Sequence, residues 1–210
     1  MTEANETVTV TAATAAQALL PDRARAICTR LGLDVVHSPV LQPGMSAQDF
    51  LGALVAERQY LDAVTFMAAA LPTREAVWWS YSCAREPRGG AASSATDAAA
   101  LAAALAWVCE PTEHNRRAAK DAADATELAT AAGLVGLAVF FSGGSIAPPD
   151  TPAVEPAEHL AAQTVRGAVM AAAVMHKPQH AEDHYRDFLK LALDIAQRRL
   201  RWDQAADGGR

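Results

Sequence analysis

Alanine content constrains this chain more than any other feature of its sequence. Fifty of the 210 residues are alanine, the residue with the highest intrinsic helix propensity because its side chain loses no rotamer freedom in a helix. The sequence therefore predicts an all-α fold. Alanine-rich helices are also thin and can approach closely, so the few large side chains must fix how they pack.

Prolines mark where several of these helices begin. Proline is tolerated in the first turn of a helix because its missing N–H would be unpaired there anyway. Five prolines are followed by polar or acidic residues, which suit the positive end of a helix dipole: Pro21, Pro72, Pro111, Pro156 and Pro178. Ser46, with Asp49 three residues later, resembles a capping box.

These signals predict helices at residues 11–31 (with a possible break at Pro21), 46–57, 59–70, 73–86, 96–109, 112–125, 127–141, 157–176 and 179–201. Residues 33–40 have some β character, but a lone short strand has nothing to pair with, so we expect an extended linker there.

Two stretches rich in glycine and proline, at about 87–95 and 142–156, separate three helical blocks. Each block is small for an independent domain. We therefore expect one helical domain over residues 11–201, with flexible tails at 1–10 and 202–210. The short connections predict antiparallel helical hairpins, packed as an irregular bundle or a short α–α superhelix.

Charge and apolar run length exclude several classes of protein. The net charge is -6 and no basic patch is present, which argues against nucleic-acid binding. The longest apolar runs fall short of the roughly 20 residues of a membrane span. The N-terminus is acidic, unlike a signal peptide, and the three cysteines are widely spaced, so we expect a cytoplasmic protein.

Residues 60–85 hold the densest group of large side chains, including Trp78 and Trp79. Neighbouring helical positions point about 100° apart. One tryptophan could therefore lie in the core while the other contacts a partner at an interface. The alternative is that both pack between helices, with Arg85 as a supporting ion-pair residue.

Histidines spaced four apart suggest a metal site near the C-terminus. His180 and His184 would share a helix face, as zinc-binding pairs do. The H-E-x-x-H order is missing, and Pro178 separates His176 from the other two. Packing at the edge of an apolar stripe is the competing interpretation of His184, and we assign no metal.

Two other patterns have simpler structural explanations. Glu110 with His114, and Glu155 with His159, repeat an E-P-x-E-H pattern, but both lie at predicted helix starts, where proline and glutamate are expected. The Ser142-Gly143-Gly144-Ser145 stretch lacks the lysine of a P-loop and follows a helix instead of opening one.

Three stretches carry a family resemblance. They read FMAAALPTREAVWW at 66–79 (with Cys83-Ala84-Arg85 following), EHNRRAAK at 113–120 and FSGGSIAPPD at 141–150. The chain resembles an uncharacterised bacterial family associated with type VI secretion gene clusters. The resemblance implies an accessory protein, an adaptor or chaperone, that acts near the secretion machinery; it implies no catalytic activity.

These observations lead to one main hypothesis. We expect a non-enzymatic, cofactor-free helical protein that binds a protein partner, a secretion-system component or effector, in a groove between hairpins. The candidate binding residues are Trp78, Trp79, Arg85, Ser142, Gly143, Gly144 and Ser145. The alternatives are a metal-dependent helical-bundle enzyme that uses His180 and His184, and a structural subunit of a larger assembly.

Overall fold

The computed structural model describes residues 23–85, 94–148, 150–175 and 177–203. Within them the chain is all-α, as predicted, and the sole β feature is a single bridge between Arg23 and Ser46. The helices are α1 (Ala24–Arg30), α2 (Ala47–Ala56), α3 (Tyr60–Ala70), α4 (Thr73–Ala84), α5 (Ala95–Cys109), α6 (Glu113–Asp124), α7 (Ala131–Phe140), α8 (Leu160–Val174) and α9 (Ala181–Ala196), with two short 3-10 helices, η2 (Asp34–His37) and η3 (Pro178–His180). Every helix in these ranges is too short or too polar to span a bilayer.

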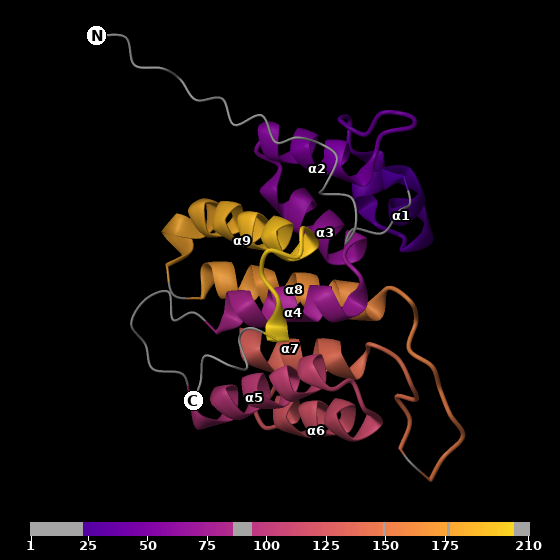
Figure 1. The fold of residues 1–210 in the computed structure, drawn as a ribbon, viewed down its shortest axis with the longest axis vertical. Coiled ribbons are helices and arrows are strands. Elements are labelled where there is room, and N and C mark those ends of the chain that lie inside the picture. The colour runs from indigo at the N-terminus through magenta and orange to yellow at the C-terminus, as the bar shows by residue number, and fades with distance from the viewer. Residues whose placement is uncertain (1–22, 86–93, 149, 176, 204–210) are drawn as a thin grey trace.

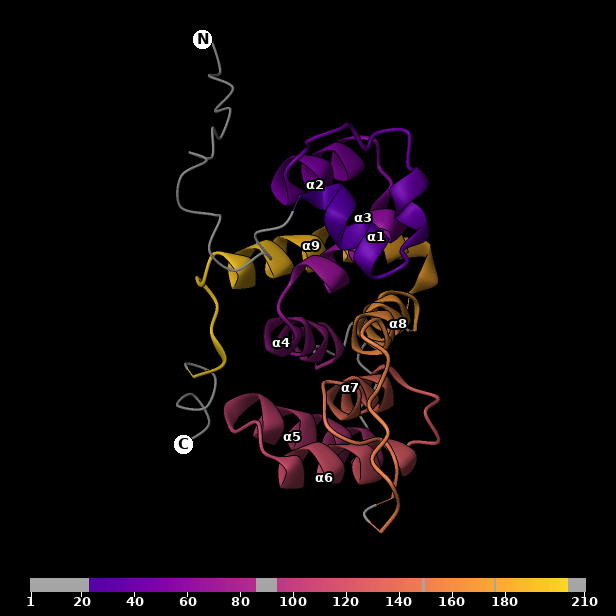
Figure 2. The same cartoon turned by 90° about the vertical axis from the view of Figure 1, so that its right-hand side faces the viewer.

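The helices form successive layers (Figures 1 and 2). One end holds α1, α2, α3 and α9, the middle holds α4 and α8, and α5, α6 and α7 form the other end. Helix α8 is central, because it packs against α3, α4, α7 and α9. The consecutive helices α5, α6 and α7 pack on one another, whereas α3 and α4 both pack mainly on α8.

Side-chain caps fix several helix starts. Ser46, Ser94, Thr112 and Thr130 each accept a hydrogen bond from a backbone amide three residues later, which satisfies one of the unpaired donors of the first turn. The cap predicted at Ser46 is confirmed, with the Asp49 amide 3.1 Å from the Ser46 Oγ. Pro72 occupies the cap position of α4, and Pro178 begins η3 ahead of α9.

Several element boundaries differ from the sequence prediction, among them the start of α8, which lies at Leu160 and not at residue 157. Residues 34–37 form η2 and not an extended linker, and Val35 is buried there. Helix α7 starts at Ala131, because Glu127 and Leu128 adopt positive φ angles of 55° and Thr130 supplies the cap. Helix α9 ends at Ala196, just before Arg198 at φ 56°.

Some predicted features lie outside the described residues. They are the first part of the helix at 11–31, most of the loop at 87–95, the tail at 1–10 and residues 204–210 of the C-terminal tail. At the start of that tail, the ring of Trp202 lies 4.4 Å from the guanidinium carbon of Arg74. Arg74 also donates to the carbonyls of Val108 and Cys109 at the end of α5.

Candidate functional site

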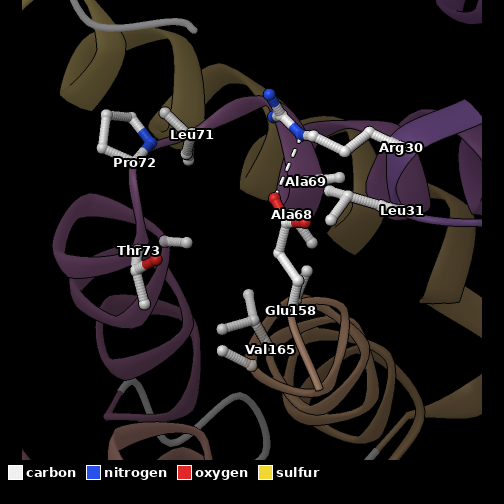
Figure 3. Close-up of a pocket in the computed structure, with 12 residues that line it drawn as sticks. Arg30, Leu31, Ala68, Ala69, Leu71, Pro72, Thr73, Glu158 and Val165 are labelled. Carbon is white, nitrogen blue, oxygen red and sulfur yellow. Dashed lines mark ion pairs between the residues drawn. The ribbon is translucent and has the colours of Figure 1, made fainter. Parts of the chain in front are cut away.

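A cavity of about 420 Å³ lies between α1, the α3–α4 turn and the start of α8 (Figure 3). It is partly open to solvent. Its wall is mostly apolar and is formed by Leu31, Ala68, Ala69, Leu71, Pro72, Ala76, Ala161, Ala162 and Val165, with Arg30, Thr73 and Glu158 as polar members.

The sequence accounts for this hollow. Four of the wall residues, Ala68 and Ala69 on α3 and Ala161 and Ala162 on α8, carry only a methyl group, so two neighbouring helices leave space between them. Leu71 and Pro72 end α3 and begin α4, and thereby form another side of the cavity. None of the residues predicted to bind a partner, which are Trp78, Trp79, Arg85 and residues 142–145, lines this cavity.

An ion pair lies at the mouth of this cavity. Arg30, the last residue of α1, points toward Glu158, just before α8, and its Nε lies 3.1 Å from a carboxylate oxygen. Their side chains are 39% and 64% exposed. Solvent screens such a pair, so it adds little to stability. The ion pair places one positive and one negative side chain beside the apolar cavity.

A smaller and more polar hollow of about 150 Å³ adjoins the first. Ala162 lines both. The polar groups of the second hollow come from Asp34, Asp62, Thr65, Gln163 and Arg166. The face made by α1, η2, α3 and α8 therefore offers an apolar hollow and a polar one side by side.

The segment between α7 and α8 is held by a buried arginine. Arg116 of α6 is only 3% exposed. Its guanidinium donates to the carbonyl of Phe140, the last residue of α7, at 2.6 Å and to the carbonyl of Ser145 at 2.8 Å. It also forms a two-point ion pair with Glu113, at 2.7 and 2.8 Å. Such bidentate pairs fix geometry as well as charge.

Arg117 adds a second set of contacts to the same segment. Its guanidinium donates to the carbonyls of Ser145 and Ala147 and to the Glu113 carboxylate. Two of the stretches that carry the family resemblance, 113–120 and 141–150, thus meet in space. We name the set Glu113, Arg116 and Arg117 the arginine clamp.

Backbone conformation and close contacts favour glycine where the segment passes the clamp. Gly144 has φ +66°, a conformation that other residues seldom adopt. A Cβ there would lie 3.2 Å from the Arg116 Nε and Nη2 atoms and from a Glu113 carboxylate oxygen. Gly144 therefore lets the backbone approach the arginine, whereas a Cβ at Gly143 would meet open space.

The clamp holds its carboxylate in the charged form. The hydrogen bond from Arg116 is the largest cause that lowers the pKa of Glu113 from its ordinary 4.5 to about 2. Burial opposes this shift, whereas the hydrogen bond from Arg117 and the positive charges of both arginines add to it. Burial acts alone on Tyr185, whose pKa it raises. It also raises the pKa of the Cys28 thiol to about 11, so this cysteine is a poor nucleophile.

Neither tryptophan lies at the surface, which corrects the expectation that one of them lines a groove. Trp78 is 1% exposed and Trp79 is fully buried. The Trp79 indole N–H donates to the carbonyl of Phe188 on α9 at 2.7 Å, and the Trp78 ring stacks on Tyr81 at 5.2 Å. Trp79 thus joins α4 to α9, and Trp78 packs in the core against a residue of its own helix.

The other candidate binding residues lie on two different elements, the end of α4 and the segment after α7. Arg85 is exposed at the end of α4. Ser142, Gly143 and Ser145 are half-buried and Gly144 is exposed, all in the clamped segment. Ser145 and Gly144 contact or approach the arginine clamp, whereas no described contact brings Arg85 to them.

The two histidines of the proposed metal site do not converge. Their ring centroids are 6.5 Å apart, and His184 Nδ1 is hydrogen-bonded to the Ala173 carbonyl at 2.7 Å. His180 is exposed beside Asp183, and His176 lies outside the described residues. Within the described ranges, no three histidine, cysteine or carboxylate side chains gather as a metal would need.

Sequence reasoning missed Arg30, Glu158 and the roles of Arg116 and Arg117. The sequence contains one sign of the clamp, since two arginines follow a glutamate at helical spacings of three and four, which allow ion pairs. It contains no sign of the pair Arg30–Glu158, because these residues are far apart in the sequence and meet through tertiary packing alone.

Comparison with known proteins places most of this structure in one family. No curated protein and no solved structure matches the chain. A family model does match residues 50–196, the region from α2 to the end of α9, which includes the clamp and most of the cavity wall. The chain therefore belongs to this family, described as the family of unknown function DUF6931.

Proposed function

We propose that this protein is a non-enzymatic, helical protein-binding factor whose cavity between α1, the α3–α4 turn and α8 receives an apolar side chain of its partner. Anchor side chains that fill pockets dominate the free energy of most protein interfaces. The cavity carries the proposal, because it combines an apolar wall, an open mouth and a charged pair at its rim.

The charges at the rim suit a protein segment better than a small apolar molecule. Arg30 and Glu158 are exposed enough to pair with side chains that flank an inserted apolar residue. The polar hollow next to the cavity offers further hydrogen-bonding groups, among them Asp62 and Arg166. An apolar anchor with polar neighbours is the usual composition of an interface.

The cellular role belongs to the same proposal. The family resemblance noted from the sequence suggests a bacterial secretion system, so the partner is a component or an effector of that machinery and the protein its cytoplasmic adaptor or chaperone. The buried tryptophans take no part in this contact. Trp79 instead joins α4 to α9 through its indole N–H.

The experiment compares capture of a partner by matched variants. Ala162→Phe places a ring in the cavity from its rim, whereas Ala172→Phe makes the same change at a half-buried position elsewhere on α8. Native pull-down with mass spectrometry should find one partner with the wild type and with Ala172→Phe. Ala162→Phe should weaken that binding about tenfold or more. Equal binding by both variants would reject the cavity as the contact.

A further inference from the structure

The segment between α7 and α8 projects beyond the helical layers. In Figures 1 and 2 its orange trace leaves the end of α7, passes the level of α6 and returns to α8. We call its described residues 145–148 and 150–155 the finger. The arginine clamp holds the base of the finger through the carbonyls of Ser145 and Ala147.

Hydrogen bonds inside the finger join its two limbs. The Ile146 amide donates to the Val154 carbonyl at 2.8 Å, and the amides of Ala147 and Val154 both donate to the Ser145 hydroxyl at 3.1 Å. Near the tip the Thr151 amide donates to the Pro148 carbonyl. The backbone of the finger is therefore already ordered before binding. Less conformational entropy is lost when a partner binds it.

The outer surface of the finger is apolar and acidic. Val154 is 51% exposed, the most exposed large hydrophobic side chain among the described residues, and Pro148 and Pro152 are exposed as well. Asp150 and Glu155 are exposed carboxylates, and the sequence from 142 to 157 contains no lysine or arginine.

We propose that the finger inserts into a concave cleft on the partner protein, with an apolar floor that receives Val154 and basic residues around its edge. This inference rests on the proposed function, and it adds a second contact to the cavity. The convex shape requires a concave partner, and the two carboxylates require positive charge around it. Phosphate backbones and anionic lipid surfaces would repel the same carboxylates.

A pair of exposed valines tests the apolar part of this contact. Val154→Ser removes the valine of the finger, and Val174→Ser removes one that is 42% exposed at the end of α8. Affinity for the captured partner should fall about tenfold with Val154→Ser and stay unchanged with Val174→Ser. Circular dichroism and thermal unfolding of both variants check that the fold is retained.

The charged part is tested by salt and by charge reversal. Wild-type affinity should fall between low and high ionic strength, because the carboxylates of the finger attract basic residues. The double variant Asp150→Lys, Glu155→Lys should bind more weakly, and its affinity should not decrease with ionic strength. The result that overturns the inference is a partner whose binding needs the cavity, as judged by Ala162→Phe, but is indifferent to Val154 and to both carboxylates.

Other outcomes also decide the question. If the wild type captures no partner at all, the proposed function fails and the finger contact fails with it. If light scattering shows that the finger variants abolish self-association instead, the cleft belongs to a second copy of this chain and the inference of a separate partner is wrong.

Discussion

Two adjacent tryptophans on α4 occupy very different polar environments. The Trp79 indole N–H donates to the Phe188 carbonyl, whereas that of Trp78 has no acceptor among the described residues. A buried donor without an acceptor is costly, and a buried hydrogen bond contributes about 1 kcal/mol. The pair is therefore an internal comparison of two indoles, one residue apart, at equal burial.

Phenylalanine at each position should separate the two contributions. Both Trp78→Phe and Trp79→Phe remove ring volume, but only Trp79→Phe also removes a hydrogen bond. We expect Trp79→Phe to lower the free energy of unfolding by about 1 kcal/mol more than Trp78→Phe. Urea unfolding of both variants measures the difference; equal losses would show that packing alone decides the contribution of both residues.

Gly144 is the residue whose backbone allows the arginine clamp to close. Alanine there must adopt φ +66° and bring its Cβ to 3.2 Å from the Arg116 guanidinium. We expect Gly144→Ala to lower the free energy of unfolding by about 1–2 kcal/mol. Gly52→Ala is the control, since Gly52 lies in α2 with open space around it and should gain about 0.5–1 kcal/mol. Thermal unfolding of both variants measures the expected loss of stability for Gly144→Ala and the expected gain for Gly52→Ala.

At the scale of elements, the clamp ties α6 to the ends of α7 and of the finger, and it does so through an ionised carboxylate. The pKa of Glu113 is about 2 in the folded protein, below its ordinary 4.5. A lowered folded-state pKa contributes stability that is present above about pH 4.5 and is lost as the pH falls toward 2. The finger should therefore loosen in acid.

Hydrogen exchange at the Ile146 amide measures this loosening, since that amide is bonded to Val154 across the finger. Protection should decrease between pH 4.5 and 2, after correction for intrinsic exchange. Glu113→Gln should reduce protection already at neutral pH and should lack the decrease. Identical pH profiles for the variant and the wild type would contradict a role for the carboxylate.

Element starts were predictable where local chemistry sets them, and their arrangement was not. The Ser46 cap and the proline before α4 mark true helix starts. The turn at Glu127 and Leu128 contains no glycine or proline, so the helix predicted at 127–141 wrongly included it. The clamp joins residues of α6 to carbonyls about thirty positions away, and side-chain spacing along one helix does not encode backbone acceptors on another element.

At the scale of the whole molecule, the segment before the family region is built into the same core. Residues 24–49 precede the matched range 50–196. Ile27 and Cys28 of α1 are nonetheless fully buried, and Leu31 lines the cavity that α3, α4 and α8 complete. The binding face proposed here therefore combines family residues with a wall from outside the family region.

This shared core predicts that the segment unfolds together with the family region. Ile27→Ala in α1 should lower the free energy of unfolding by about 2–4 kcal/mol, as should Leu54→Ala in α2, because each deletes a fully buried aliphatic side chain. Both variants should shift one cooperative transition that fluorescence and circular dichroism report alike. Thr29→Ala, at an exposed position of α1, should change the free energy of unfolding by no more than about 0.5 kcal/mol. A separate early transition in Ile27→Ala, with Leu54→Ala affecting only the later one, would instead make residues 24–49 an independently unfolding cover on the cavity.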